Sequence, residues 1–473
     1  MTMQATRRDG WPGWLAIEDG TLTADGCRLP DLAARYGTPL WVISRERLEA
    51  NFARFRAAFR RRGPDTEVAY SMKANSTLAV VRVLNGAGAR IDCSSEHEIA
   101  LARRAGVPGG DIVVNGNGKS DGTLRACADE GVLQVNIDSE MEAERLDAIA
   151  AERGVVVDCA VRIQLSYDRL LAEDPSFEST LTVGEGKFGN NVSSGDAMST
   201  VAAVVAAPNL HFVGLHHHVG FSGYMGDYTP EREVMHHREC TREICDLAKT
   251  IMRELDVVCE RFDLGGGFRG GESVYLASPG DGEDGGFHPL PAIDDYVEAI
   301  VSTIEEELPR ERNPRLMFET GGYQVADAAL FLTTVAEVKR KHGPKARDFV
   351  TVDGSMQMFT SKGTMRVASE VVVANRVSTE GVRGGGLADV VGQTCVYDAL
   401  AEAIELGPVE VGDRLCLLGH GAYCDTTGTQ MNSFPRPASV MISSGEPVLV
   451  RRRETLDDVA ARDLIPDLGG GSG

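Results

Sequence analysis

At 473 residues the chain is long enough for two domains with sizeable cores, and its 42% hydrophobic content is ordinary for a globular protein. The 48 basic residues against 70 acidic ones give a formal net charge of −22, which repels phosphate backbones and anionic membranes, so nucleic-acid binding is not expected. No apolar run approaches the length of a signal-peptide core or a membrane span, which predicts a cytoplasmic protein. The ten cysteines form no CxxC pair, which argues against a structural zinc site.

From about residue 45 to 305, short apolar segments alternate with longer amphipathic ones, as in EVAYSMKA followed by TLAVVRVLNGAG and ARIDCSS followed by EHEIALARRAG. This alternation predicts repeated βα units and a parallel sheet. Several units over about 250 residues favour a closed β/α barrel, with an open doubly wound sheet as the alternative.

From about residue 320 the texture changes to strand-like runs such as FLTTVAEVKR and VASEVVVANRV, which predict a second, mostly β domain. We therefore expect residues 1–44 to contribute to the β domain, 45–305 to form the barrel, 306–466 to form the C-terminal β domain, and 467–473 to be a flexible tail. Residues 269–293 are rich in Gly and acidic residues and are expected to form a loop insertion after a barrel strand.

Lys73 ends the strand-like run VAYSMKANS. A lysine there must either reach water or lose its charge, and a desolvated lysine has a lowered pKa that suits Schiff-base chemistry. A lysine that simply reaches water is the plainer interpretation.

Two further segments place candidate chemistry after predicted strands. FDLGGGFRGG contains Gly265, Gly266 and Gly267, a turn that lets backbone N–H groups approach a phosphate, although such a turn is often only flexible. Glu319 follows the apolar run in MFETGG, where a carboxylate is costly unless it is paired or at the surface.

Near the C-terminus, Cys395 stands in VVGQTCVYDAL and Tyr423 in LLGHGAYCDTTG. A partly exposed thiol near a cation could donate a proton or act as a nucleophile, although most cysteines of this kind are inert. The run LHHHVGFSG contains three consecutive histidines, of which only His216 and His218 could share one face of a strand. Three such histidines cannot all bind one metal ion from a strand.

In order and spacing, VAYSMKANS, GLHHHVG, DLGGGF, GQTC and GAY resemble the fold-type III pyridoxal-phosphate (PLP) decarboxylases, the group that contains diaminopimelate, ornithine and arginine decarboxylases. AVRIQLSYD and the KFG tripeptide at Lys187 to Gly189 add to the resemblance, which covers nearly the whole chain. It implies a TIM-like barrel of the alanine-racemase type with a mostly β C-terminal domain, and no metal.

The resemblance also assigns roles to individual residues. It implies that Lys73 holds the PLP cofactor as a Schiff base, that Glu319 pairs with the pyridine nitrogen, and that His218 stacks on the face of the ring. It implies that the phosphate is bound by a set of mostly small residues near the glycine turn: Gly265, Gly266, Gly267, Gly321 and Tyr423. Cys395 matches a cysteine that reaches the active site of the partner subunit and protonates the product, which implies a homodimer with shared sites.

Four positions depart from the family pattern. The family's EPGR is ETGG here, so an arginine for the phosphate is replaced by Gly322, and Phe221 stands where a serine is expected, which makes Ser222 the candidate donor. The acidic residue that receives a distal substrate ammonium is Val396, although Asp398 could replace it. The arginine for a distal carboxylate has no match at its place in QMFTSKGTMR, where Lys362 and Arg366 are nearby.

These departures predict a decarboxylase, in specialised metabolism such as siderophore or antibiotic synthesis, whose substrate has a modified or non-cationic side chain. The alternatives are diaminopimelate decarboxylase in lysine biosynthesis, a PLP-dependent racemase or other lyase, and a non-catalytic regulatory homologue.

Overall fold

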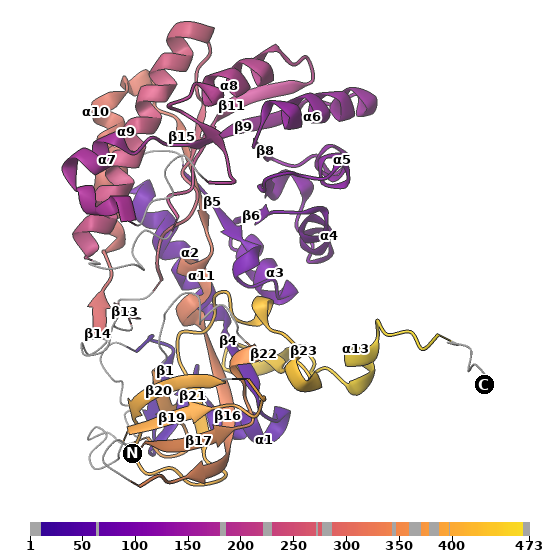
Figure 1. The fold of residues 1–473 in the computed structure, drawn as a ribbon, viewed down its shortest axis with the longest axis vertical. Coiled ribbons are helices and arrows are strands. Elements are labelled where there is room, and N and C mark those ends of the chain that lie inside the picture. The colour runs from indigo at the N-terminus through magenta and orange to yellow at the C-terminus, as the bar shows by residue number, and fades with distance from the viewer. Residues whose placement is uncertain are drawn as a thin grey trace, which may run out of the picture.

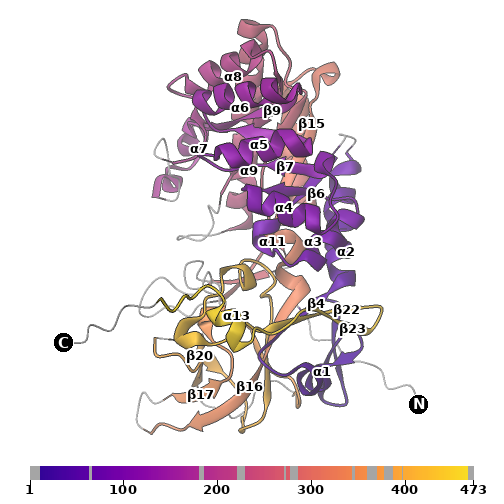
Figure 2. The ribbon, with the colours of Figure 1, turned by 90° about the vertical axis from the view of Figure 1, so that its right-hand side faces the viewer.

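The computed structural model describes residues 11–62, 66–179, 186–220, 229–270, 273–276, 286–342, 347–358, 370–377, 387–396 and 398–466. A barrel occupies one end of the molecule and a β domain the other, as two views at right angles show (Figure 1, Figure 2). Among the helices in these residues, none is both long enough and apolar enough to cross a membrane.

Eight parallel strands form the barrel, which closes because the last strand pairs with the first and β8 pairs with β9. In the order of the closed sheet the strands are β5 (Thr66–Ser71), β6 (Arg90–Cys93), β7 (Ile112–Val114), β8 (Gln134–Ile137), β9 (Val157–Gln164), β11 (Leu210–His216), β12 (Arg261–Asp263) and β15 (Arg315–Thr320). The short β10 (Asn190–Asn191) adds to β9. The predicted closed barrel is confirmed, and the open sheet is excluded.

Helices between the strands surround the barrel (Figure 1). They are α2 (Arg45–Arg60), α3 (Leu78–Gly86), α4 (Glu96–Arg104), α5 (Asp121–Glu130), α6 (Glu140–Arg153), α7 (Asp168–Glu173), α8 (Asp196–Ala206), α9 (Pro230–Leu255) and α10 (Ile293–Glu307). Serine begins several of them because its hydroxyl accepts an N–H that the first turn leaves unbonded, as Ser95 does for Glu98 and Ser139 for Glu142.

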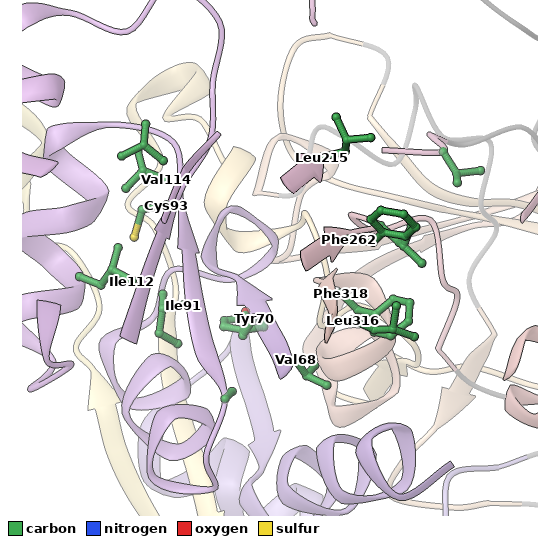
Figure 3. Packing of buried hydrophobic residues seen from close by; sticks show 14 of the residues in the cluster. Val68, Tyr70, Ile91, Cys93, Ile112, Val114, Leu215, Phe262, Leu316 and Phe318 are labelled. Atoms are coloured by element: carbon green, nitrogen blue, oxygen red, sulfur yellow. The ribbon is translucent and has the colours of Figure 1, made fainter. Parts of the chain in front are cut away.

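The barrel strands place their apolar cluster residues on one face and most of their polar side chains on the other. Alternate residues such as Val68 and Tyr70 on β5, or Leu316 and Phe318 on β15, pack in one hydrophobic cluster with the surrounding helices (Figure 3). Since successive side chains on a strand point to opposite faces, the residues between them point into the barrel. The barrel interior is therefore where the polar side chains of the strands meet.

The β domain combines strands from the N-terminal and C-terminal parts of the chain. Its main sheet has the order β20-β19-β17-β16-β4-β22-β23, with β21 pairing β16 and β18. These strands are β4 (Leu40–Ser44), β16 (Ala329–Lys339), β17 (Asp348–Val352), β18 (Val371–Val373), β19 (Leu387–Val391), β20 (Ala399–Glu405), β21 (Arg414–Leu417), β22 (Ala438–Ser443) and β23 (Glu446–Arg451). The N-terminal β4 thus lies between two C-terminal strands.

The remaining elements are small. A three-stranded sheet of β1 (Leu15–Glu18), β2 (Thr21–Ala24) and β3 (Cys27–Arg28) precedes α1 (Leu29–Tyr36), while α11 (Gly322–Val325) and α13 (Leu456–Ala460) follow the barrel and the main sheet.

Two expectations about the organisation need correction. The barrel does not end at residue 305, because its eighth strand is β15 at Arg315–Thr320, directly before the β domain. The insertion at 269–293 is not only loop, since β13 (Ser273–Leu276) and β14 (Gly286–Pro289) form an antiparallel pair within it. The tail at 467–473 lies outside the described residues.

Candidate active site

Lys73 lies just after β5, in the short turn of residues 72–74. Its Nζ donates a hydrogen bond of 2.8 Å to Oδ2 of Asp92, which is buried at the end of the next strand. Asp92 also accepts from Ser71 Oγ at 2.7 Å and from Asn115 Nδ2 at 2.8 Å. The lysine side chain is 41% exposed, so its amine is both held in place and accessible to a ligand.

The lowered pKa that a desolvated Lys73 would have is not found. Burial by itself would lower the pKa, but the negative charges of Asp92 and then Glu319 outweigh it and raise the pKa above that of an ordinary lysine. The amine is therefore protonated before it reacts. Asp92 is the neighbouring group positioned to accept the proton that must leave.

Glu319, on β15, is buried inside the barrel, and both of its carboxylate oxygens have polar partners. Its Oε1 accepts from Asn115 Nδ2 at 2.5 Å and from Asn136 Nδ2 at 3.2 Å, and its Oε2 lies 3.2 Å from His216 Nε2. Burial would raise its pKa, but His216 and Lys73 lower it, so that the pKa lies below that of an ordinary glutamate. Glu319 is a carboxylate that can stabilise a positive charge beside it.

The triple-glycine turn follows β12 directly and packs against the ends of two other strands. Gly265 and Gly267 have positive φ values of 62° and 99°. A Cβ on Gly265 would lie 2.5 Å from His217 O, and one on Gly266 would lie 2.8 Å from Glu319 O. Only glycine allows this close approach, and successive glycines in such a turn form the kind of backbone nest that binds phosphate.

The three consecutive histidines have different surroundings. His216 meets Glu319, whereas His217 Nδ1 lies 3.4 Å from Ile163 O, and its ring is beside that of Tyr167. His218 borders Gly266 and accepts from Gly220 N at 3.1 Å through Nδ1, which leaves the ring proton on Nε2. Burial, with the charge of Lys73 second, lowers the His218 pKa to about 3. His218 is therefore a neutral ring.

His216, Asp263 and Glu319 bring one ligand-type atom each within 4.8 Å of one another, the one such group among the described residues. His216 is thus the one member of the histidine run that belongs to this polar group. Asp263 also accepts from Gly265 N at 3.1 Å and from Gln134 Nε2 at 3.2 Å, so its oxygens already have partners within the protein.

A loop of the β domain completes the lysine side of the site. Tyr423 N donates to Ala74 O at 2.7 Å, Asn75 Nδ2 donates to Gly421 O at 3.2 Å, and Thr426 Oγ1 donates to Lys73 O at 3.1 Å. The Tyr423 hydroxyl lies 3.0 Å from where a Cβ on Gly321 would stand. Lys73, Gly321 and Tyr423 are therefore brought together, as the sequence predicts.

Cys395 lies elsewhere in this chain, between β19 and β20. It is the single exposed cysteine of the ten, all of which are in described segments, and its N donates to Asn432 Oδ1 at 3.1 Å. Eight of the others are buried, in agreement with the expectation for most of them. The neighbouring Val396 is 40% exposed.

The carboxylate of Asp398 is 4% exposed and is used within the protein. It accepts from Ser355 Oγ at 2.8 Å, from Met356 N at 2.5 Å, and from Thr394 through both N at 3.1 Å and Oγ1 at 2.6 Å. These four bonds fix the loop and leave Asp398 poorly suited to receive a substrate cation. Phe221, Ser222, Lys362 and Arg366 lie outside the described residues.

Sequence reasoning missed several polar residues inside the barrel. Asp92, Asn115, Asn136 and Asp263 stand at or near the ends of apolar strands, in RIDC, IVVN, QVNI and RFDLGGG. A polar residue inside such an apolar run was the available signal, because burying a polar side chain in a barrel costs free energy unless a hydrogen-bond partner is there.

The comparisons with known proteins agree with this geometry. The family described as "Pyridoxal-dependent decarboxylase, pyridoxal binding domain" matches residues 45–326. The diaminopimelate decarboxylase of Actinosynnema pretiosum subsp. auranticum is 33% identical over 461 residues, covering 96% of this chain and 95% of that protein. That of Corynebacterium efficiens is 31% identical over 468 residues, covering 96% and 94%.

Among solved structures, diaminopimelate decarboxylase from M. jannaschii in complex with L-lysine superimposes with a TM-score of 0.82 at 28% identity. The match covers 96% of this chain and 98% of that one.

The residues present fit PLP. The turn after β12 requires glycine because a Cβ on Gly265 or Gly266 would meet a backbone oxygen, and successive glycines of this kind can bind a phosphate through their N–H groups. Glu319 offers a buried carboxylate, and Lys73 offers an accessible amine. When bound, PLP supplies the electron sink that accepts the electron pair released at the substrate α-carbon. The chain therefore belongs to the family of pyridoxal-dependent decarboxylases and is a PLP-dependent carboxy-lyase that acts on an amino acid.

Proposed function

We propose that the enzyme decarboxylates diaminopimelate to lysine. The observation that carries the proposal is the similarity along almost the full length to curated diaminopimelate decarboxylases, at 31–33% identity. A solved relative was crystallised with L-lysine. These comparisons favour the diaminopimelate alternative over the substrate of specialised metabolism that the departures in sequence predict.

The site residues have separate tasks in this proposal. Lys73 would hold the aldehyde end of the cofactor, with its neighbour Asp92 as the acceptor for its proton, and the anionic Glu319 would favour a proton on the pyridine nitrogen. The neutral ring of His218 would lie against one face of the cofactor. Gly265, Gly266, Gly267, Gly321 and Tyr423 surround the phosphate, with Ser222 as a further donor.

We also propose a homodimer with shared active sites. Cys395 has an exposed thiol, and among the described residues no hydrogen bond or ion pair joins it to Lys73, Glu319 or the glycine turn. Cys395 of the partner subunit would then deliver the proton to the α-carbon after carbon dioxide leaves. Val396 would accompany it and contact the substrate side chain.

A second candidate substrate is an amino acid whose far end carries no free ammonium. The observation that favours it is the pairing of a half-exposed Val396 with an Asp398 whose oxygens are already bonded. An ammonium placed against valine alone would be unpaired, at a cost of several kcal/mol if it is fully desolvated.

A direct assay separates the two candidates. Carbon dioxide release is measured with the PLP-loaded enzyme on meso-diaminopimelate, and on the same compound acylated at its distal nitrogen. The proposal expects diaminopimelate to be turned over at the higher kcat/KM. Faster turnover of the acylated compound would reject it in favour of the second candidate. In deuterated water, a racemase would instead exchange the α-proton without releasing carbon dioxide.

A testable prediction concerns Gly322, which occupies the place of a family arginine. Among the described residues, a Cβ there would meet only Phe268 O, at 4.0 Å, and the backbone is not in the left-handed region, so a side chain fits. We expect Gly322→Arg to tighten PLP binding by roughly 10- to 100-fold, since a charge-assisted hydrogen bond to phosphate contributes about 1.5–3 kcal/mol.

The measurement for this variant is the PLP dissociation constant of the apoenzyme by fluorescence titration, with Gly322→Met as a control for side-chain bulk. Equal affinities for the Arg and Met variants would show that no phosphate lies within reach of position 322.

A further inference from the structure

The barrel interior contains a second carboxyl group beside Glu319, that of Asp263. Asp263 is fully buried at the end of β12. Its Oδ2 accepts from Asn136 Nδ2 at 3.3 Å, and the same amide nitrogen lies 3.2 Å from Glu319 Oε1. The two carboxyl groups thus share one donor, and their oxygens approach each other within 4.8 Å.

Two carboxylates this close in a buried site disfavour double ionisation, which raises the pKa of one of the two groups. The surroundings decide which group that is. Glu319 faces the cationic Lys73, the imidazole of His216 and the amide of Asn115, all of which favour an anion.

Among the described residues, the hydrogen bonds that Asp263 accepts all come from neutral donors. The polar groups around it are Glu319 from β15, His216 from β11, Gln134 and Asn136 from β8, and the N–H of Gly265. The one cation nearby on its own strand, Arg261, donates to Gln134 Oε1 at 2.6 Å. Burial and the charge of Glu319 raise the Asp263 pKa well above that of an ordinary aspartate.

We propose that Asp263 is a positioning residue that acts as a neutral acid, donating its proton to Glu319 while its Oδ1 anchors the glycine turn through Gly265 N. The side chain of Asp263 thereby fixes both Glu319, which would face the pyridine nitrogen, and the glycine turn, which would face the phosphate. The two ends of the cofactor then have a set separation, which favours PLP over ligands of another length.

This role rests on the cofactor site and not on the identity of the substrate, so a failed diaminopimelate assay would leave it intact. It makes a specific demand on substitutions. Asp263→Asn retains a donor toward Glu319 and an acceptor for Gly265 N. Gln134 Nε2 and Asn136 Nδ2 lose Oδ2 as an acceptor but keep Asn136 Oδ1 and Glu319 Oε1, so the variant should behave like the neutral acid. Asp263→Ala loses both the donor and the acceptor.

The first test is PLP affinity, measured on apoenzyme without substrate. We expect Asp263→Asn to bind within about threefold of the unaltered enzyme and Asp263→Ala to bind at least about tenfold more weakly, as the loss of a hydrogen bond to a charged group implies. Equal weakening in both variants would overturn the proposal, because it would mean that the negative charge of Asp263 is what matters.

The second test does not require the Ala variant to fold. It compares thermal unfolding of the unaltered apoenzyme with that of Asp263→Asn from pH 5 to pH 9. A carboxyl whose pKa is higher in the folded state stabilises fully only below its unfolded pKa, and this contribution is lost as the pH rises toward the folded value. The amide has no such dependence.

The unaltered protein should therefore lose stability relative to Asp263→Asn as the pH rises. Parallel melting curves, or a difference of the opposite sign, would show that Asp263 is ionised in the folded apoenzyme and would reject the proposal.

Discussion

Replacing Lys73 with alanine is expected to remove the visible absorption of the bound cofactor and to reduce carbon dioxide release by at least about a thousandfold. No other amine among the described residues is bonded to Asp92, so no side chain can take over the attachment of the cofactor. The substitution also leaves the buried Asp92 carboxylate with only Ser71 and Asn115 as donors.

The matched control is Lys339→Ala, which removes a surface lysine of the β domain whose side chain forms an exposed ion pair with Glu337. That variant should retain the absorption band and the activity. The measurements are the visible spectrum after reconstitution with PLP and the rate of carbon dioxide release. An unchanged spectrum for Lys73→Ala would contradict the assignment and would support a non-catalytic homologue.

Glu319→Gln is expected to lower kcat by about a hundredfold or more, because a neutral amide cannot hold a proton on the pyridine nitrogen and the charge-assisted bond is lost. The low pKa of Glu319 shows that this site favours a full negative charge there. The shorter Glu319→Asp keeps the charge, so its kcat should lie between that of the unaltered enzyme and that of Glu319→Gln.

The stability of the same variant provides a check that does not depend on turnover. A carboxylate whose folded pKa is lowered stabilises the protein above its unfolded pKa, and that contribution disappears as the pH falls through the folded value. The difference in melting temperature between the unaltered apoenzyme and Glu319→Gln should therefore narrow from pH 7 toward pH 3. Activity of the Gln variant equal to that of the unaltered enzyme would reject the role of Glu319.

The alternating strands and helices of the barrel were predictable because each follows from a local pattern of apolar and polar residues. Strands and helices alternate along the chain, and motifs at strand ends identify Lys73, the triple glycine and Glu319. The barrel boundary was predicted too early, at residue 305, although the sequence changes in texture only at about residue 320, where β15 ends and β16 follows within a few residues.

Properties that depend on strand pairing could not be read from the sequence. The pKa of Lys73 rises because Asp92, 19 residues away, lies on the neighbouring strand, and isolated inspection of VAYSMKANS predicts the opposite direction. The engagement of Asp398 depends in the same way on Ser355 and Met356, more than 40 residues earlier in the chain. Such contacts are set by register and packing, which a linear pattern does not specify.

The loop that contacts the turn at Lys73 also affects when, during synthesis, the enzyme can bind its cofactor. Thr426 and Lys73 are separated by 353 positions, and Gly421 and Asn75 by 346, yet they are hydrogen-bonded partners. During synthesis the chain must therefore emerge from the ribosome as far as Thr426 before the lysine turn gains its final support. We expect a nascent chain that ends after the barrel to capture PLP poorly, so that cofactor loading follows translation of the C-terminal domain rather than accompanying it.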